Sequence, residues 1–187
     1  NTSLPKAARL MVETNIMDLP IFGKEEVVGI LDDSSLLKEM PSDIADEKIK
    51  KFMTKEVITT APDYKISKLI DDFKEKQISR MPVMENGNLS GIVTMHDYIR
   101  KAIKPTQGID WGTIVNEKNR ILDLPVRNIM TRDVITANWN DSAESIIEKM
   151  IDNEINSVII LNDMEVLAGI VTRKDLLKPF MERIDST

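Results

Sequence analysis

A hydroxyl group and a carboxylate recur at the same spacing in two places in the sequence. The segments GIVTMHD (Gly91–Asp97) and GIVTRKD (Gly169–Asp175) each place a threonine three residues before an aspartate. At the start of a helix this pattern can form a capping box, in which both side chains satisfy backbone amides. The same groups can also hold a ligand, because a carboxylate accepts hydrogen bonds from vicinal hydroxyls and a helix N-terminus favours an anion. The sequence around the two copies has to decide between these interpretations.

The composition leaves little room for catalytic chemistry. The 187 residues include no cysteine, which removes thiolate nucleophiles, disulfides and zinc–thiolate clusters. The one histidine, His96, excludes a multi-histidine metal site. The glycine-rich phosphate-binding motifs G-x-x-x-x-G-K-[ST] and G-x-G-x-x-G do not occur in the sequence. We therefore predict no catalytic residue, no metal and no cofactor, and a protein that is not an enzyme.

Charge and hydropathy limit the partners. The net charge of −6 gives no basic field for nucleic acid or an anionic membrane. No apolar run approaches the roughly 20 residues that span a bilayer. We expect a cytoplasmic protein that binds neither a membrane nor, through this region, a nucleic acid.

An internal repeat explains why the motif occurs twice. Residues 52–101 align with residues 129–178, and one extra residue in the second copy falls in a turn. Each copy predicts a strand, a helix, two strands joined by a tight turn, and a closing helix. In the first copy the opening strand is expected at Val57–Thr59. Helix caps are expected at Asp63 and, in the second copy, at Asp141 with Glu144.

A third, incomplete copy precedes these two. Ser3–Lys38 overlays the first full copy, with Pro20 on Pro82, but it lacks the opening strand. We expect residues ahead of Asn1 to complete it. We call residues 1–39 the half-repeat, 50–103 the middle repeat and 125–181 the last repeat, with linkers at 40–49 and 104–124.

The half-repeat departs from the motif. Asp32 stands where Thr94 stands in the middle repeat, Ser35 stands at the position of Asp97, and Asp18 replaces Arg80. Extra carboxylates repel a phosphate, so we expect this copy to pack without binding a nucleotide through its own motif.

The order of these elements resembles that of CBS domains, small βαββα modules named after cystathionine β-synthase. The resemblance rests on the opening MT..VIT pattern, the RMPV strand and the G-h-h-T-x-x-D ending, where h is apolar. It implies an α+β fold of tandem CBS domains that pair into a Bateman module, which binds adenine nucleotides.

Connector lengths suggest which repeats pair. In four-repeat archaeal CBS proteins, and similarly in the γ subunit of AMP-activated protein kinase, the long connector lies inside a pair. By that analogy the middle and last repeats form one module, and the half-repeat belongs to an upstream one. An order shifted by one repeat remains an alternative.

The resemblance also implies two binding sites, each shared across the pair. The first would use Arg80, Ile92, Thr94 and Asp97, with Thr131, Val134, Ile155 and Asn156 of the other repeat. Its mate would use Ile170, Thr172 and Asp175, with Thr54, Val57, Ile78 and Ser79.

The chemistry of these residues suits a nucleotide independently of the resemblance. Asp97 or Asp175 can accept hydrogen bonds from ribose, the threonine hydroxyls suit a phosphate, and the short apolar strands suit adenine. Arg80 can grip a phosphate, whereas Ser157 stands at its position in the last repeat. The site of Asp97 should therefore favour the phosphorylated ligand. Arg173 and Lys174 could assist the mate site, but we expect them to face solvent, and we expect His96 to lie on a helix surface.

We predict a regulatory module that senses AMP, ADP or ATP. S-adenosylmethionine or another adenosyl ligand is an alternative, and so is a scaffold in which Thr-x-x-Asp only caps helices. A homodimer through the CBS helices fits each of these interpretations, and the regulated partner protein is unknown.

Overall fold

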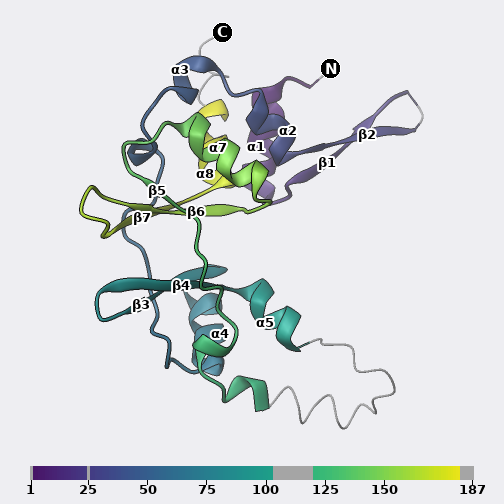
Figure 1. Cartoon of the computed structure of the whole chain (residues 1–187). Coiled ribbons are helices and arrows are strands. Elements are labelled where there is room, and N and C mark those ends of the chain that lie inside the picture. The colour runs from purple at the N-terminus through teal and green to yellow at the C-terminus, as the bar shows by residue number, and fades with distance from the viewer. Residues whose placement is uncertain (1, 25, 103–119, 182–187) are drawn as a thin grey trace. The chain divides into compact units, whose positions relative to one another are not determined.

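The computed structural model of the chain describes residues 2–24, 26–102 and 120–181 (Figure 1). Most of the linker expected at 104–124 lies outside these residues. Two compact units form: unit 1 comprises residues 1–55 and 136–187, and unit 2 comprises residues 56–135. Unit 1 therefore contains the half-repeat with most of the last repeat, and unit 2 contains most of the middle repeat.

The half-repeat forms a helix, a hairpin and a second helix. Its elements are α1 (Leu4–Thr14), β1 (Asp18–Phe22), β2 (Val27–Asp32) and α2 (Asp33–Lys38). Strands β1 and β2 pair antiparallel, with Pro20 opposite Ile30. Helix α3 (Ser42–Ala45) and the 3₁₀ turn η1 (Ile49–Lys51) continue the chain.

The last repeat contributes a three-stranded sheet and two helices to unit 1. Its elements are β5 (Thr136–Asn138), α7 (Ala143–Asp152), β6 (Ser157–Leu161), β7 (Leu167–Thr172) and α8 (Arg173–Met181). The strand order is β5–β6–β7, with β5 parallel and β7 antiparallel to β6.

Unit 2 has the same local order. It contains α4 (Ile66–Glu75), β3 (Arg80–Glu85), β4 (Asn88–Thr94), α5 (Met95–Ala102) and the 3₁₀ turn η2 (Val126–Asn128). Strands β3 and β4 form the hairpin that the Asn-Gly pair predicts, because Asn86 and Gly87 both have positive φ. The matching hairpin β6–β7 has a longer loop, so the extra residue of the last repeat falls in the turn, as predicted.

The core of unit 1 joins the half-repeat to the last repeat. Helices α1 and α2 pack against α8, as Figure 1 shows. The side chains that meet there are fully or almost fully buried: Met11, Leu36, Leu37, Met150, Leu176, Leu177 and Phe180. The half-repeat thus packs, as predicted. Its hairpin is less covered, because Phe22 and Ile30 are 70% and 71% exposed.

The core of unit 2 confirms the helical periodicity of the sequence. Ile66, Leu69 and Phe73 of α4 are buried at the expected spacing. Leu69 and Phe73 pack with Met81, Val83, Val93 and Val126. No helix among the described residues is long and apolar enough to cross a bilayer.

Two predicted strand and cap assignments are wrong. Val57–Thr59 form no strand, and only Thr60 bridges to Val83. Asp63 does not cap α4 but pairs with Arg127. The helix starts later because the amide of Ile66 donates to Leu124 O at 3.0 Å, so a distant backbone segment fixes its first turn.

The cap expected in the last repeat is also displaced by one residue. Ser142, not Asp141, is the N-cap of α7, and its hydroxyl accepts from the amide of Ser145. Asp141 accepts instead from the amide of Asn138 at 3.1 Å, which closes the turn between β5 and the helix.

The opening segments, residues 53–57 and 130–134, cross over β7 and β4, the strands that end in the motif threonines. Thr131 pairs with Ile92 in unit 2, and Thr54 pairs with Ile170 in unit 1. The motif glycines permit this crossing. A Cβ on Gly91 would lie 2.7 Å from Thr131 O, and one on Gly169 would lie 2.9 Å from Thr54 O. Glycine is needed here for close approach of two backbones.

Replacing Gly169 by alanine should therefore lower the free energy of unfolding by about 1–3 kcal/mol, because the new methyl group overlaps backbone and forces the segment away. Chemical denaturation followed by circular dichroism measures this. Gly29→Ala is the matched control, since its Cβ would meet only Ile21 Cδ1, at 3.9 Å. Equal stability of the two variants would contradict the close crossing.

Candidate functional site

The first candidate group lies at the start of α5, directly after β4. Asp97 Oδ2 accepts from the amide of Thr94 at 2.9 Å and from its hydroxyl at 2.7 Å. The amide of Asp97 donates in return to Thr94 Oγ1 at 3.2 Å. Together these bonds form the capping box that the spacing predicts. They occupy only one carboxylate oxygen: within the described residues, no hydrogen bond reaches Asp97 Oδ1.

The second group, at the start of α8, repeats this geometry with one difference. Asp175 Oδ2 accepts from the amide and hydroxyl of Thr172 at 3.0 and 2.7 Å. Asp175 Oδ1, however, accepts from Lys178 Nζ at 2.7 Å. The Asp175 side chain is 11% exposed and that of Lys178 is 56% exposed, so the lysine covers the carboxylate from the solvent side.

Arg100 occupies the position of Lys178 in the middle repeat, and it turns elsewhere. Its guanidinium contacts His96 Nδ1 at 3.1 Å on the exposed face of α5. The prediction that His96 lies on a helix surface is therefore confirmed. Lys174 stands at the position of His96 and donates to Asn15 Oδ1 instead. The two carboxylates thus differ in access because of residues one helical turn away.

Each opening segment lies beside one of these groups. Two backbone hydrogen bonds of 2.9 Å join Thr131 to Ile92, two residues before Thr94. In unit 1, bonds of 2.8 and 3.0 Å join Thr54 to Ile170, two residues before Thr172. Ile92 and Ile170 are half-buried, as apolar neighbours of a bound ring would be. The other predicted members, Val57 and Val134, lie further along the segments in irregular backbone.

Strand register places the residues that differ between the groups. Arg80 lies directly opposite Thr94 in the β3–β4 pair, and Ser157 lies opposite Thr172 in the β6–β7 pair. Side chains at opposed positions of an antiparallel pair stand on the same face, with Cβ atoms about 5 Å apart. A guanidinium therefore accompanies the first threonine, and a hydroxyl accompanies the second.

The remaining predicted residues lie next to the helix start of their own repeat. Ser79 O accepts from the amide of Met95 at 2.8 Å, and Asn156 O accepts from the amide of Arg173 at 3.2 Å. Ile78 and Ile155 precede them. Within each unit this grouping differs from the predicted sets, which paired Ser79 with Asp175 and Asn156 with Asp97. The sharing of these residues across repeats stays a prediction.

The half-repeat uses its altered motif as a simple helix cap. Asp32 Oδ1 accepts from the amide of Ser35 at 2.6 Å, just as Thr94 Oγ1 accepts from the amide of Asp97 in the middle repeat. The pKa of Asp32 is lowered mainly by a hydrogen bond from the Ser35 side chain, and to a smaller extent by the bond from the Ser35 amide. The carboxylate is thus already held by its own helix.

Arg173 corrects another expectation. We expected it to face solvent, but its side chain is only 13% exposed and pairs with Asp33 at 3.0 Å. Sequence reasoning missed this contact, because 140 residues separate the partners and no local pattern links them. Among the described residues, no group of three or more His, Cys, Asp or Glu side chains could hold a metal ion.

Tandem βαββα repeats with a Thr-x-x-Asp pair at the strand–helix junction define a class of small paired ligand-binding modules. All three repeats match the CBS domain, over residues 1–42, 49–104 and 126–182. The chain belongs to the CBS-domain family. The predicted resemblance and the α+β class of tandem CBS domains are confirmed.

Several archaeal proteins are similar to the chain. The uncharacterized protein MJ1225 of Methanocaldococcus jannaschii is 26% identical over 185 residues, which cover 96% of this chain and 64% of that protein. That protein is described as a proposed archaeal homologue of γ-AMPK, and its crystal structure superposes on this chain with a TM-score of 0.78. The inosine-5′-monophosphate dehydrogenase of the same organism is 29% identical over 153 residues, 81% of this chain and 27% of the enzyme.

A second similar structure contains ligands. The CBS domain pair of protein MJ0100 was crystallised with 5′-methylthioadenosine and S-adenosyl-L-methionine. It is 26% identical, with a TM-score of 0.59, and the match covers 73% of this chain and 98% of that pair. CBS domain pairs are regulatory ligand-binding modules, and CBS-domain proteins are in general not catalytic.

The capping role of the threonines gives a direct test. Thr172→Val should lower the free energy of unfolding by about 1 kcal/mol, since it leaves the amide of Asp175 without its acceptor and removes the hydroxyl that donates to Asp175 Oδ2. Thr172→Ser keeps the hydroxyl and should be close to wild type. Thermal unfolding of both variants measures the difference. A valine variant as stable as the serine variant would show that the hydroxyl does not cap the helix.

Proposed function

We propose that the chain is a regulatory module that binds adenosine nucleotides (AMP, ADP or ATP), with ribose on the motif aspartates. One observation carries the proposal: each Thr-x-x-Asp pair stands at a helix N-terminus beside an opening segment, and no side chain in the described part of the chain donates to Asp97 Oδ1. The family and the adenosyl ligands of MJ0100 support an adenine-type ligand.

Asp97 suits the ribose because its two oxygens have separate tasks. Oδ2 accepts both bonds from Thr94 and so fixes the carboxylate at the helix start. A carboxylate oxygen can accept two hydrogen bonds, so Oδ1 can serve both vicinal hydroxyls. The ligand then adds to the capping box without breaking it.

Arg80 and the helix start suit the phosphate. Arg80 lies across the hairpin from Thr94, so its guanidinium can reach an anion near the first turn of α5. The Thr94 hydroxyl already donates a hydrogen bond to Asp97, and the amides of Thr94 and Asp97 are bonded within the capping box. Arg80 and the positive end of the helix would therefore attract the phosphate. This modifies the sequence-based proposal, in which the hydroxyl itself would bind the phosphate.

The group around Asp175 suits a different adenosyl ligand. Ser157 replaces the guanidinium across the hairpin, and Lys178 already occupies Asp175 Oδ1. A ribose must displace this lysine, so binding should be weaker than at Asp97. An uncharged adenosyl compound such as 5′-methylthioadenosine, one of the ligands of MJ0100, is the favoured ligand here.

A scaffold without ligand is the competing function. The capping boxes satisfy the Thr-x-x-Asp pairs in both full repeats, so these pairs alone do not require a nucleotide. Self-association through helices fits either function. In unit 1, however, α1, α2 and α8 already bury apolar side chains against each other, so a homodimer there would need other faces.

Isothermal titration calorimetry with AMP separates the two functions. Asp97→Asn should weaken AMP binding by about 10- to 100-fold, because it removes charge-assisted hydrogen bonds worth roughly 1.5–3 kcal/mol. Asn is close in shape and can still accept from Thr94, so the fold is retained. Asp175→Asn is the matched control and should change AMP affinity far less. No heat from the folded wild-type protein would favour the scaffold.

The lysine on Asp175 gives a second test. Lys178→Met should raise the affinity for 5′-methylthioadenosine about threefold, the size expected when an exposed ion pair no longer competes. Lys174→Met removes the same charge one turn earlier without uncovering Asp175, and it should leave the affinity unchanged. A fall in affinity with Lys178→Met would show that the lysine helps to hold the ligand.

A further inference from the structure

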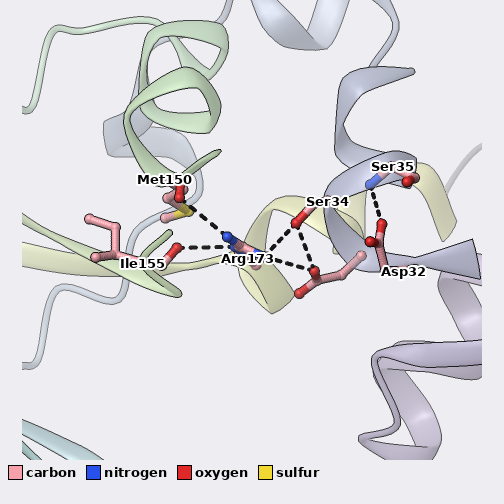
Figure 2. Close-up of polar contacts among 7 residues, drawn as sticks. Asp32, Ser34, Ser35, Met150, Ile155 and Arg173 are labelled. Carbon is pink, nitrogen blue, oxygen red and sulfur yellow. Dashed lines mark hydrogen bonds and ion pairs between the residues drawn. The ribbon is translucent and has the colours of Figure 1, made fainter. Parts of the chain in front are cut away.

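Arg173 ties together three segments of unit 1 (Figure 2). Its Nη1 donates to Asp33 Oδ1 at 3.0 Å and to Ser34 Oγ at 2.5 Å. Its Nη2 donates to Met150 O at 3.2 Å, and its Nε donates to Ile155 O at 3.1 Å. One guanidinium thus connects the half-repeat with the end of α7 and with the residue before Asn156.

On the half-repeat side, Asp33 is held for this contact. It is the first residue of α2 and the one charged residue that is buried in the described part of the chain. Ser34 Oγ supports it, with 3.3 Å between the hydroxyl and Asp33 Oδ1. A buried carboxylate requires a charged partner, so the docking of α2 and the position of Arg173 depend on each other.

On the other side, Arg173 holds the turn that leads into β6. Glu154 has a left-handed backbone, φ 53°, and the turn is closed by the amide of Ile155 on Met150 O. The backbone amide of Arg173 also donates to Asn156 O. The turn therefore accepts three hydrogen bonds from this one residue, at Met150, Ile155 and Asn156.

The middle repeat lacks this device. Met95 stands in place of Arg173 there, and only its amide bond to Ser79 O remains. The guanidinium clamp is thus an addition to the last repeat, the repeat that packs against the half-repeat.

We propose that Arg173 is a positioning residue that makes the Ile155–Asn156 turn depend on the docking of the half-repeat. When Asp33 is in place, the guanidinium stays buried and holds the two carbonyls. When Asp33 is withdrawn, a buried unpaired charge is unfavourable, so Arg173 moves to solvent and releases the turn.

A consequence follows for the ligand, and it rests on the proposed function. The turn lies at the helix start that carries Asp175, because Asn156 O accepts from the amide of Arg173, and Arg173 lies between Thr172 and Asp175 in the chain. Docking of the half-repeat and binding of an adenosyl compound should therefore favour each other, and linkage requires the effect to be reciprocal. The half-repeat then regulates the site although its own motif is altered.

The test uses Asp33→Asn in the whole chain, with Asp32→Asn as the matched control. Both variants lose one negative charge at neighbouring positions. Asp32 caps α2 and makes no hydrogen bond to Arg173, and Asn is itself a good cap. Amide hydrogen exchange by NMR, without ligand, measures the opening of the turn.

We expect Asp33→Asn to speed exchange at the amides of Ile155 and Arg173 about tenfold, and Asp32→Asn to leave it unchanged. Equal exchange in both variants would overturn the positioning role. If α2 undocks altogether, amides throughout α1 would also exchange faster. Ser34→Ala, which removes one bond to Arg173 and no charge, should then still raise exchange at the turn alone, and no change there would also overturn the role.

Calorimetry with 5′-methylthioadenosine tests the coupling. Affinity should fall about tenfold in Asp33→Asn and not in Asp32→Asn, within the usual range of coupling between sites. Wild-type binding that Asp33→Asn leaves unchanged would overturn the coupling. No binding to the wild type would overturn the proposed function and the coupling, while the exchange experiment still decides the role of Arg173.

Discussion

Backbone pairing joins each opening segment to the strand that ends in the motif threonine, β4 or β7, and so determines what lies beside both Thr-x-x-Asp pairs. Thr131 on Ile92 and Thr54 on Ile170 bring a second stretch of chain against the strand that ends in Thr-x-x-Asp. Gly91 and Gly169 lie directly under these stretches, and any side chain there would overlap the crossing backbone. Thr54 of the middle repeat belongs to unit 1 and Thr131 of the last repeat belongs to unit 2, so each unit contains a stretch of the other full repeat. The glycine of each GIVT sequence is therefore required by the packing of the backbone, whether or not a ligand binds.

The two candidate ligand groups share this backbone arrangement and differ only in a few neighbouring side chains. Both aspartates are fixed by the same capping box, yet Lys178 covers Oδ1 of Asp175, whereas none of the described residues covers that of Asp97. The cause lies in the residue one turn before each cation. His96 contacts Arg100 in the middle repeat, whereas Lys174 donates to Asn15 and offers Lys178 no acceptor in the last repeat. Two near-identical motifs can therefore have different ligands without any change in the residues that define them.

Local signals explain what the sequence could predict. The face of α4, the Asn-Gly hairpin and the Thr–Asp pairs each depend on residues within a few positions of one another, and each is present. Predictions failed where distant backbone decides the outcome. Leu124 fixes the start of α4 and displaces the cap expected at Asp63, and the strand expected at Val57–Thr59 is reduced to a bridge at Thr60. The contact of Arg173 with Asp33 had no local pattern at all. In the candidate site, the sequence identified the motif residues but not the lysine that covers Asp175.

A crystal structure of the chain with AMP would show whether Asp97 holds the ribose. Both ribose hydroxyls should lie within hydrogen-bond distance of Asp97 Oδ1, with Thr94 still bonded to Oδ2 and the phosphate near Arg80. A nucleotide bound elsewhere, or crystals at saturating AMP in which Asp97 contacts only Thr94, would contradict this arrangement. The motif aspartates would then be helix caps alone.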